Sequence, residues 1–256
     1  MLKRMVAVLM AVLAPLMLTS CFIAPGKFVS TLDVNRDRSF TFTYKGEVFA
    51  LDLEKSMQGL GDLDEEGGEE DGEAVTEGEA SWQPASLKQD SADFSEEEDD
   101  DKAEQERKNR AIADALRGEA GYRSVEYKGD GLFLIDYAIN GRLDHAFVYP
   151  YNLDAEIVLP FVAIELRGNE RVRVKAPAFG EGNQQSGGMA GSSASKAADR
   201  LDGTFTLTTD AEIISQNNED GATEANGRRS VTWRATPISK DAPMAVLKLA
   251  PLPPAR

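Results

Sequence analysis

Apolar and polar residues alternate with a period of two over most of this 256-residue chain, outside one acidic stretch. Successive side chains of a β-strand point to opposite faces of its sheet, so this alternation predicts strands with one buried face. The pattern occurs in residues 28–34 and again in residues 40–44, on either side of the polar run at residues 35–38. These two segments predict an antiparallel hairpin with one apolar face.

Further strands are predicted at short intervals in the second half of the chain. Asn140-Gly141 and Gly168-Asn169 stand where two-residue hairpin turns are expected. A run rich in Gly, Ser and Ala at residues 180–198 is expected to form a flexible loop. The predicted strands are residues 125–127, 133–139, 143–149, 156–166, 170–175, 204–214, 230–236 and 244–249.

One segment, residues 102–117, has a helical pattern instead. Glu104 and Glu106 stand four residues before Lys108 and Arg110, which is the favourable order for ion pairs on a helix. The apolar stripe consists of Ile112, Ala115 and Leu116. One helix and eight or more strands predict an α+β, mainly β domain, with an antiparallel sheet arranged as a sandwich or a partly closed barrel.

The negative charge of the chain is concentrated in one segment. Residues 62–106 contain twenty Asp and Glu against two Lys, a local net charge of −18, whereas the whole chain carries −16. Such a composition buries too little apolar surface to offset the entropy of ordering, so residues 57–101 are predicted to be a long disordered acidic insertion. The remaining chain offers no evident basic patch, and nucleic acid is not expected as a partner.

The first twenty residues have the pattern of a secretory signal peptide. Lys3 and Arg4 precede an apolar run at residues 5–17, which is shorter than the ~20 residues that a membrane-spanning helix needs. The run ends at a segment that resembles the lipobox of bacterial lipoproteins: Leu18, Thr19, Ser20 and Cys21. This resemblance implies cleavage before Cys21 and a diacylglyceryl thioether on its sulfur.

Cys21 is the only cysteine of the chain, so an intrachain disulfide is excluded. With its thiol in the implied thioether, cysteine catalysis would be excluded as well. Two or three acyl chains would hold the protein at a bilayer surface without spanning it. Lipoprotein sorting commonly uses Asp after the lipidated cysteine for retention at the inner membrane, and this chain has Phe22. We therefore expect a cell-envelope location, at the periplasmic face of the outer membrane if the cell has two membranes.

Motifs that carry catalysis are missing from the sequence. His145 is the only histidine, and it follows Asp144 on a predicted strand, where neighbouring side chains point to opposite faces. One histidine and one lipidated cysteine cannot supply the usual zinc or iron ligands. There is also no nucleophile elbow, phosphate-binding loop or dinucleotide signature. We expect neither an enzyme nor a metal or cofactor site.

Trp233 alternates with Val231 and Ala235, so it is expected to be a core residue whose indole N–H bonds a backbone carbonyl. The alternative is an aromatic wall for a ligand. Several predicted strands also have aromatic inner faces, which would suit a lipid: Phe133, Tyr137, Phe147, Tyr149 and Phe161.

The closing part of the chain has four short segments in a recognisable order, at residues 211–214, 217–221, 231–233 and 245–247. Together with the opening hairpin, which is similar in pattern, they resemble LppM-type bacterial envelope lipoproteins. This resemblance implies a small α+β domain on a lipid tether, with proposed lipid or glycolipid contact and no catalysis.

Two functional hypotheses follow. The first is a non-enzymatic binding module for a lipid or glycolipid, held at the membrane through Cys21. The second is a structural or assembly lipoprotein that docks an envelope protein through its acidic arm. The predicted division of the chain is a signal peptide (1–20), a tether with the hairpin (21–56), the acidic segment (57–101), the helix and β-rich domain (102–250) and a tail (251–256).

Overall fold

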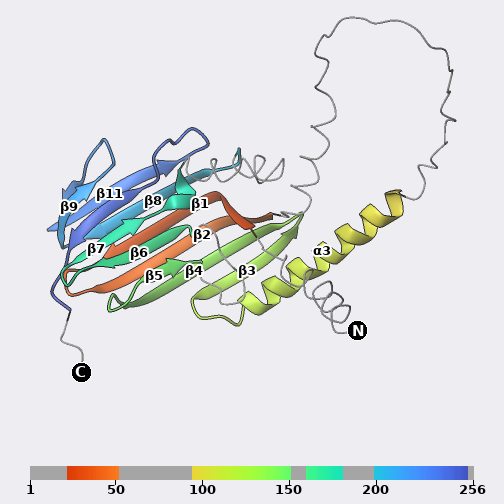
Figure 1. Ribbon diagram of the computed structural model, residues 1–256, viewed down its shortest axis with the longest axis horizontal. Helices are drawn as coiled ribbons and strands as arrows, with labels where there is room; N and C mark the ends of the chain where they lie inside the picture. Colours follow the sequence, from red (N-terminus) through yellow and green to blue (C-terminus); the bar gives the residue numbers. More distant parts are fainter. Residues whose placement is uncertain (1–21, 52–93, 151–159, 181–198, 253–256) are drawn as a thin grey trace, which may run out of the picture.

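The computed structural model describes residues 22–51, 94–150, 160–180 and 199–252 (Figure 1). Within these ranges the chain forms two β-sheets, one long α-helix and the short 3-10 helix η2 (Pro177–Phe179). No helix in the described part of the chain is both long enough and apolar enough to cross a membrane.

The larger sheet has seven strands. All neighbouring strands are antiparallel except β1 and β8, which are parallel. A period of two is the same for both kinds of pairing, so the sequence pattern did not reveal this exception. Their order is β10 (Thr223–Ala225), β11 (Arg228–Ala235), β8 (Asp202–Thr209), β1 (Phe22–Val34), β2 (Ser39–Leu51), β4 (Leu132–Arg142) and β3 (Tyr122–Gly129).

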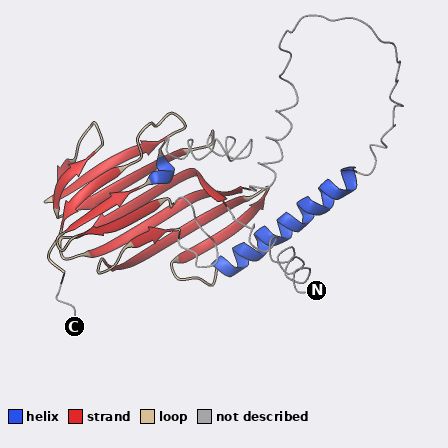
Figure 2. Ribbon diagram, viewed as in Figure 1, coloured by secondary structure: helices blue, strands red, loops and turns tan. Residues whose placement is uncertain are grey.

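The smaller sheet has five strands, all antiparallel to their neighbours. The two sheets stack face to face as layers (Figure 2), which confirms the predicted mainly β class and, of the two predicted arrangements, the sandwich. The order of strands is β5 (Phe147–Tyr149), β6 (Val162–Arg167), β7 (Arg171–Lys175), β12 (Met244–Lys248) and β9 (Glu212–Gln216).

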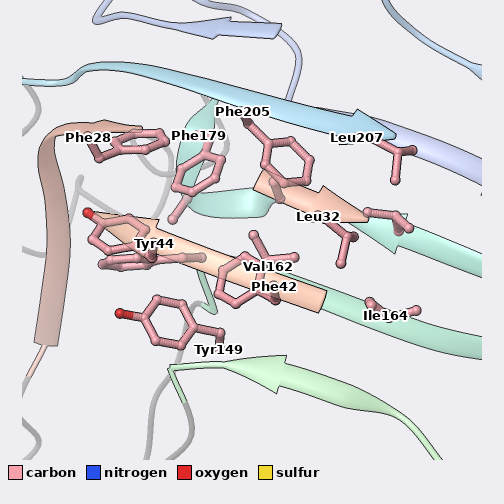
Figure 3. Packing of buried hydrophobic residues seen from close by; sticks show 14 of the residues in the cluster. Phe28, Leu32, Phe42, Tyr44, Tyr149, Val162, Ile164, Phe179, Phe205 and Leu207 are labelled. Atoms are coloured by element: carbon pink, nitrogen blue, oxygen red, sulfur yellow. The ribbon is translucent and has the colours of Figure 1, made fainter. Parts of the chain in front are cut away.

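Aromatic rings from both layers fill the interior of the sandwich (Figure 3). The ring of Phe28 stacks on Phe179 with centroids 4.3 Å apart, and Phe42 contacts Tyr149 at 5.0 Å. Gly203 leaves the space that Phe28 occupies, because a Cβ there would lie 2.1 Å from Cε1 of the ring. The core therefore joins the two sheets through direct ring contacts.

Helix α3 (Phe94–Leu116) lies along β3 at one edge of the larger sheet (Figure 1). Ala113 is buried with Val125 of β3, and the hydroxyl of Tyr127 donates to Glu106 Oε1 at 2.7 Å. Both predicted ion pairs form, whereas Ala115 of the predicted apolar stripe is exposed.

This helix begins at Phe94 rather than at residue 102, so it includes the end of the predicted acidic segment. Carboxylates near a helix N-terminus interact favourably with the helix dipole, which accounts for the longer helix. The rest of the acidic segment, residues 57–93, lies outside the described residues, as does most of the predicted loop at 180–198.

Two sequence predictions of strand connections are wrong. Asn140 and Gly141 do not form a turn: they continue β4, opposite Thr41 and Phe40 of β2, and the chain then crosses to β5 in the other sheet. Similarly, residues 204–214 form two strands in different sheets, β8 and β9, with a corner at Asp210. Inward residues keep alternating through this corner, so period two alone does not record it.

The turn between β1 and β2 is fixed by a buried arginine, Arg38, whose exposure is 0%. Its guanidinium donates to the carbonyls of Ala250 (2.6 Å), Leu143 (2.9 Å) and Asn169, which come from three separate connections. Burial lowers the pKa of Arg38. The closing segment is also held here, because the N–H of Leu252 donates to Asn169, so the predicted free tail is ordered as far as this residue.

Candidate functional site: a basic face on the smaller sheet

Strand β7 points three cationic side chains away from the core. Val172 and Val174 are buried, so the alternate residues Arg171, Arg173 and Lys175 lie on the outer face of the smaller sheet. The local sequence Arg-Val-Arg-Val-Lys dictates this arrangement, because strand side chains alternate between faces.

Strand pairing brings two more cations to the same face. Arg171 lies opposite Arg167 of β6 on one side and opposite Lys248 of β12 on the other. Three cations therefore stand side by side across three neighbouring strands, which are spaced by ~4.8 Å. We call the following set the basic face: Arg167, Arg171, Arg173, Lys175 and Lys248.

Two carboxylates lie beside the basic face: Glu165 of β6, opposite Arg173, and Glu212 of β9, opposite Lys248. Glu165 of β6 pairs with Lys175 at 2.9 Å and with Arg167, and the hydrogen bond from Lys175 is the main cause that lowers the Glu165 pKa. Among the described residues, no carboxylate forms an ion pair with Arg171 or Arg173, and Arg173 Nε is buried without a hydrogen-bond partner. Arg171 is exposed, so its donors are available to an anion, whereas the buried Nε of Arg173 is not.

Like charges directly opposite each other destabilise a sheet. The row Arg167–Arg171–Lys248 contains two such contacts on adjacent strands. An anion with several negative groups would remove the repulsion and accept the free N–H groups in charge-assisted hydrogen bonds. The arrangement is therefore suited to binding an anion and has no evident advantage for folding.

The structure thus corrects the expectation that the chain has no basic patch. Part of this face could have been predicted from the sequence of β7, which has a basic residue at every second position. Arg167 and Lys248 were not assignable, because they join the face only through the pairing of β6, β7 and β12.

The predicted lipidation site directly precedes β1 in the sequence. Cys21 and the lipobox residues Leu18, Thr19 and Ser20 are outside the described residues, but β1 begins at Phe22, which pairs with Leu51 of β2. Described structure thus starts one residue after Cys21. A lipid on Cys21 would hold this end of the sandwich directly at the bilayer.

Asp144 and His145 form a contact that the sequence prediction had excluded. They lie in a bend between β4 and β5 rather than on a strand, so their side chains meet through Oδ1 and Nδ1. The hydrogen bond from His145 lowers the pKa of Asp144. Both side chains are mainly exposed, at 58% and 83%, and a pair so accessible to water has little electrostatic effect.

Trp233 is a core residue, as predicted. It is 7% exposed, Val231 and Ala235 are fully buried, and Thr232 between them is exposed. Its indole N–H donates to the side-chain oxygen of Asn217 at 3.0 Å, not to a backbone carbonyl. The same oxygen also accepts the N–H at the start of β12, so Asn217 ties β11 to the smaller sheet.

The aromatic residues that suggested a lipid ligand pack on one another. Tyr149 contacts Tyr137 at 4.5 Å and Phe161 at 6.1 Å between centroids, and Phe147 contacts Phe42 at 5.4 Å. These rings build the core, so the reason for expecting a lipid inside the sandwich is removed.

A polar cleft of about 300 Å³ lies beside the corner between β8 and β9. Its lining has both charges, and its Arg229 and Glu224 approach each other to 3.7 Å. It is lined by Arg36, Thr209, Asp210, Ala211, Glu212, Glu224, Gly227 and Arg229. Two arginines and three carboxylates line it, so the cleft has no excess of positive charge for an anion, unlike the basic face.

No protein-family model matches the chain, and none of the curated proteins does. Among solved structures, the NMR structure of the folded domain of LppM from Mycobacterium tuberculosis is similar over 91% of this chain and 94% of that domain. The identity is 11% and the TM-score is 0.30. Function must therefore be inferred from the residues of this chain.

Proposed function

We propose that this chain is a lipid-anchored protein of the bacterial cell envelope and a non-enzymatic module that binds a polyanion. The lipobox ending at Cys21 supports the anchor. The binding role is carried by one observation, the row Arg167–Arg171–Lys248, in which like charges face each other across paired strands. The ligand class is a molecule with several phosphate or carboxylate groups, such as the headgroup of an anionic glycolipid.

The proposed anchor and the proposed binding surface would lie at opposite ends of β1. Strand β1 has 13 residues, so at ~3.3 Å per residue it spans roughly 40 Å. Lys248 lies near the far end of β1, because Ala250 N–H donates to the carbonyl of Arg36 in the turn after β1. The ligand would accordingly be bound away from the bilayer that holds Cys21.

The anchor is tested by replacing Cys21 with Ser. We expect the wild-type protein to incorporate labelled palmitate and to sediment with membranes, and Cys21→Ser to lose the label and become soluble or keep its signal peptide. In a cell with two membranes, density-gradient fractions should contain the protein with outer-membrane markers. A mutant that fractionates like an unlabelled wild type would refute lipid anchoring.

The binding role is tested with inorganic polyphosphate. Arg167→Gln with Arg171→Gln removes two charge-assisted contacts, each worth at least ~1.5 kcal/mol, so the Kd should rise about a hundredfold. Lys45→Gln is the matched control, since Lys45 is an exposed cation on the outer face of the larger sheet, 3.7 Å from Asp136. Binding to vesicles with anionic lipids but not to purely zwitterionic vesicles would indicate a lipid headgroup rather than a soluble polymer. Equal polyphosphate affinities for the wild type and the double variant would disprove the proposal that the basic face binds anions.

A second candidate is an assembly lipoprotein that docks a basic envelope protein through the acidic segment. The −18 charge of residues 62–106 favours it. It requires that deleting residues 62–79 abolish assembly while the sandwich still folds. An unchanged assembly after this deletion would exclude it.

A further inference from the structure

We infer that the acidic residues 62–79 of the chain dock on its own basic face. The inference rests on the proposed role of that face as an anion-binding surface, and it identifies a segment of the same chain as one of its anionic ligands. The sandwich and the acidic segment would then not be independent parts: the segment would compete with external ligands.

The two surfaces match in charge. Residues 62–79 contain ten Asp and Glu and no Lys or Arg. The basic face presents five cations, and within the described residues Glu165 is the carboxylate that pairs with members of the set. The segment would thus supply carboxylates to Arg171, which forms no ion pair within the described part of the chain.

The chain is long enough for this contact. It leaves the larger sheet at Leu51 and re-enters described structure at Phe94, so 42 residues lie between them. Fully extended, 42 residues span up to roughly 140 Å. This length exceeds a return path along the sandwich of ~40 Å in each direction.

The proposed anchor favours the same contact. The segment leaves the larger sheet at Leu51, which pairs with Phe22 beside Cys21. It ends at α3, which passes the same end of the sheet, because Lys102 pairs with Asp130 in the turn whose Gly131 accepts from Ala50. Anionic headgroups repel a negative segment near their surface. The basic face at the far end of the sandwich attracts it, and a tethered partner acts at an effective concentration in the millimolar range.

The test uses the full chain from residue 21 onward, with Cys21→Ser to keep it soluble. A carbodiimide joins carboxylates to lysine amines that are in direct contact, and mass spectrometry maps the linked peptides. We expect links from residues 62–79 to be at least five times more frequent on Lys175 and Lys248 than on the exposed controls Lys27 and Lys45. Lys27 is the stringent control, because it is on the anchor half of β1, closer to Leu51.

Two changes should remove these links. Salt at 1 M shortens the screening length to about 3 Å and should reduce them severalfold. Arg167→Gln with Arg171→Gln should do the same without altering either target lysine. Links spread evenly over Lys27, Lys45, Lys175 and Lys248 would overturn the inference. So would links between isotope-labelled and unlabelled copies, which would indicate that a second molecule is the occupant.

The outcomes separate this inference from the proposed function. If polyphosphate binds the full chain through Arg171 but the specific links are missing, the docking is wrong and the anion-binding role remains. If neither polyphosphate binding nor specific links depend on Arg167 and Arg171, the proposed function of the basic face is also wrong.

Discussion

The two outer faces of the sandwich are built on the same kind of strand, yet their side chains differ. On the larger sheet, Thr232, Thr206, Thr31 and Thr43 form a row across four neighbouring strands. Their hydroxyls bond in pairs, at 3.2 Å for Thr206–Thr232 and 2.6 Å for Thr31–Thr43. On the smaller sheet, the corresponding row is Arg167–Arg171–Lys248, in which no member can neutralise another.

This difference distinguishes a surface that stabilises the fold from the surface that we propose binds a ligand. Threonine is a good strand former, and paired threonines on neighbouring strands contribute to sheet stability. Three adjacent cations do the opposite, and binding sites commonly have such a cost in stability. If the smaller sheet binds the ligand as proposed, mutations on the two sheets should have opposite effects on stability and binding.

The largest expected effect is on stability and comes from the larger sheet. Trp233→Ala removes a buried ring from β11, the strand that carries Thr232, and should cost roughly 3–5 kcal/mol of unfolding free energy. Thermal melting and expression level measure this. Polyphosphate affinity per folded molecule should stay unchanged, because Trp233 belongs to the other sheet. If Trp233→Ala melted like the wild type, the core assignment would be wrong.

A smaller effect is expected on binding. Glu165→Gln releases Lys175 and Arg167 from their carboxylate partner, so polyphosphate should bind about threefold more tightly, or ~0.7 kcal/mol. Glu165 is one-third exposed, so its pairs should contribute less than about 1 kcal/mol to folding. A titration measures the affinity, and an affinity equal to or lower than that of the wild type would show that Glu165 does not compete with the ligand.

The pH dependence of this effect follows from the lowered pKa of Glu165, caused chiefly by Lys175. A depressed carboxylate pKa contributes stability above the unfolded-state pKa, and that stability is lost as the pH falls through the folded-state pKa. Acidification below the usual pKa range of Glu should thus weaken the ion pairs of Glu165 in the wild type, whereas Glu165→Gln has no such pairs to lose. The difference in polyphosphate affinity between the two proteins should shrink as Glu165 becomes protonated.

The sequence predicted the class of fold because alternation reports which face of a strand is buried. It predicted Trp233 as a core residue for the same reason. It did not predict where the chain changes sheets, since inward residues keep their period through the corner at Asp210 and through Asn140-Gly141. The Asn-Gly motif expresses only a local preference for a turn. Here the pairing of Asn140 and Gly141 with β2 outweighs that preference.

The candidate site was predictable only in part. Arg171, Arg173 and Lys175 have the spacing of one strand face, so a basic stripe could have been found. Arg167 and Lys248 are 81 residues apart in sequence, and only the order β6-β7-β12 makes both of them neighbours of Arg171. A net charge close to zero outside the acidic segment concealed this grouping, because charge sums carry no information about position.

The smallest predicted effect tests the comparison most directly. In a chain that lacks residues 62–79, Arg171→Thr should raise the melting temperature, because it removes two like-charge contacts and introduces a better strand former. A gain of ~0.5 kcal/mol corresponds to about 1–2 °C for a domain of this size. In the full chain the gain should be smaller, since the docked acidic segment already offsets the repulsion. The gain in melting temperature should also fall at 1 M salt, where the screening length is about 3 Å.

The control is Lys45→Thr on the larger sheet, which loses its pair with Asp136 and should not raise the melting temperature. If Arg171→Thr left the melting temperature unchanged or lowered it at low salt without residues 62–79, the cationic row would have no cost, and the contrast between the two faces would lose its physical basis.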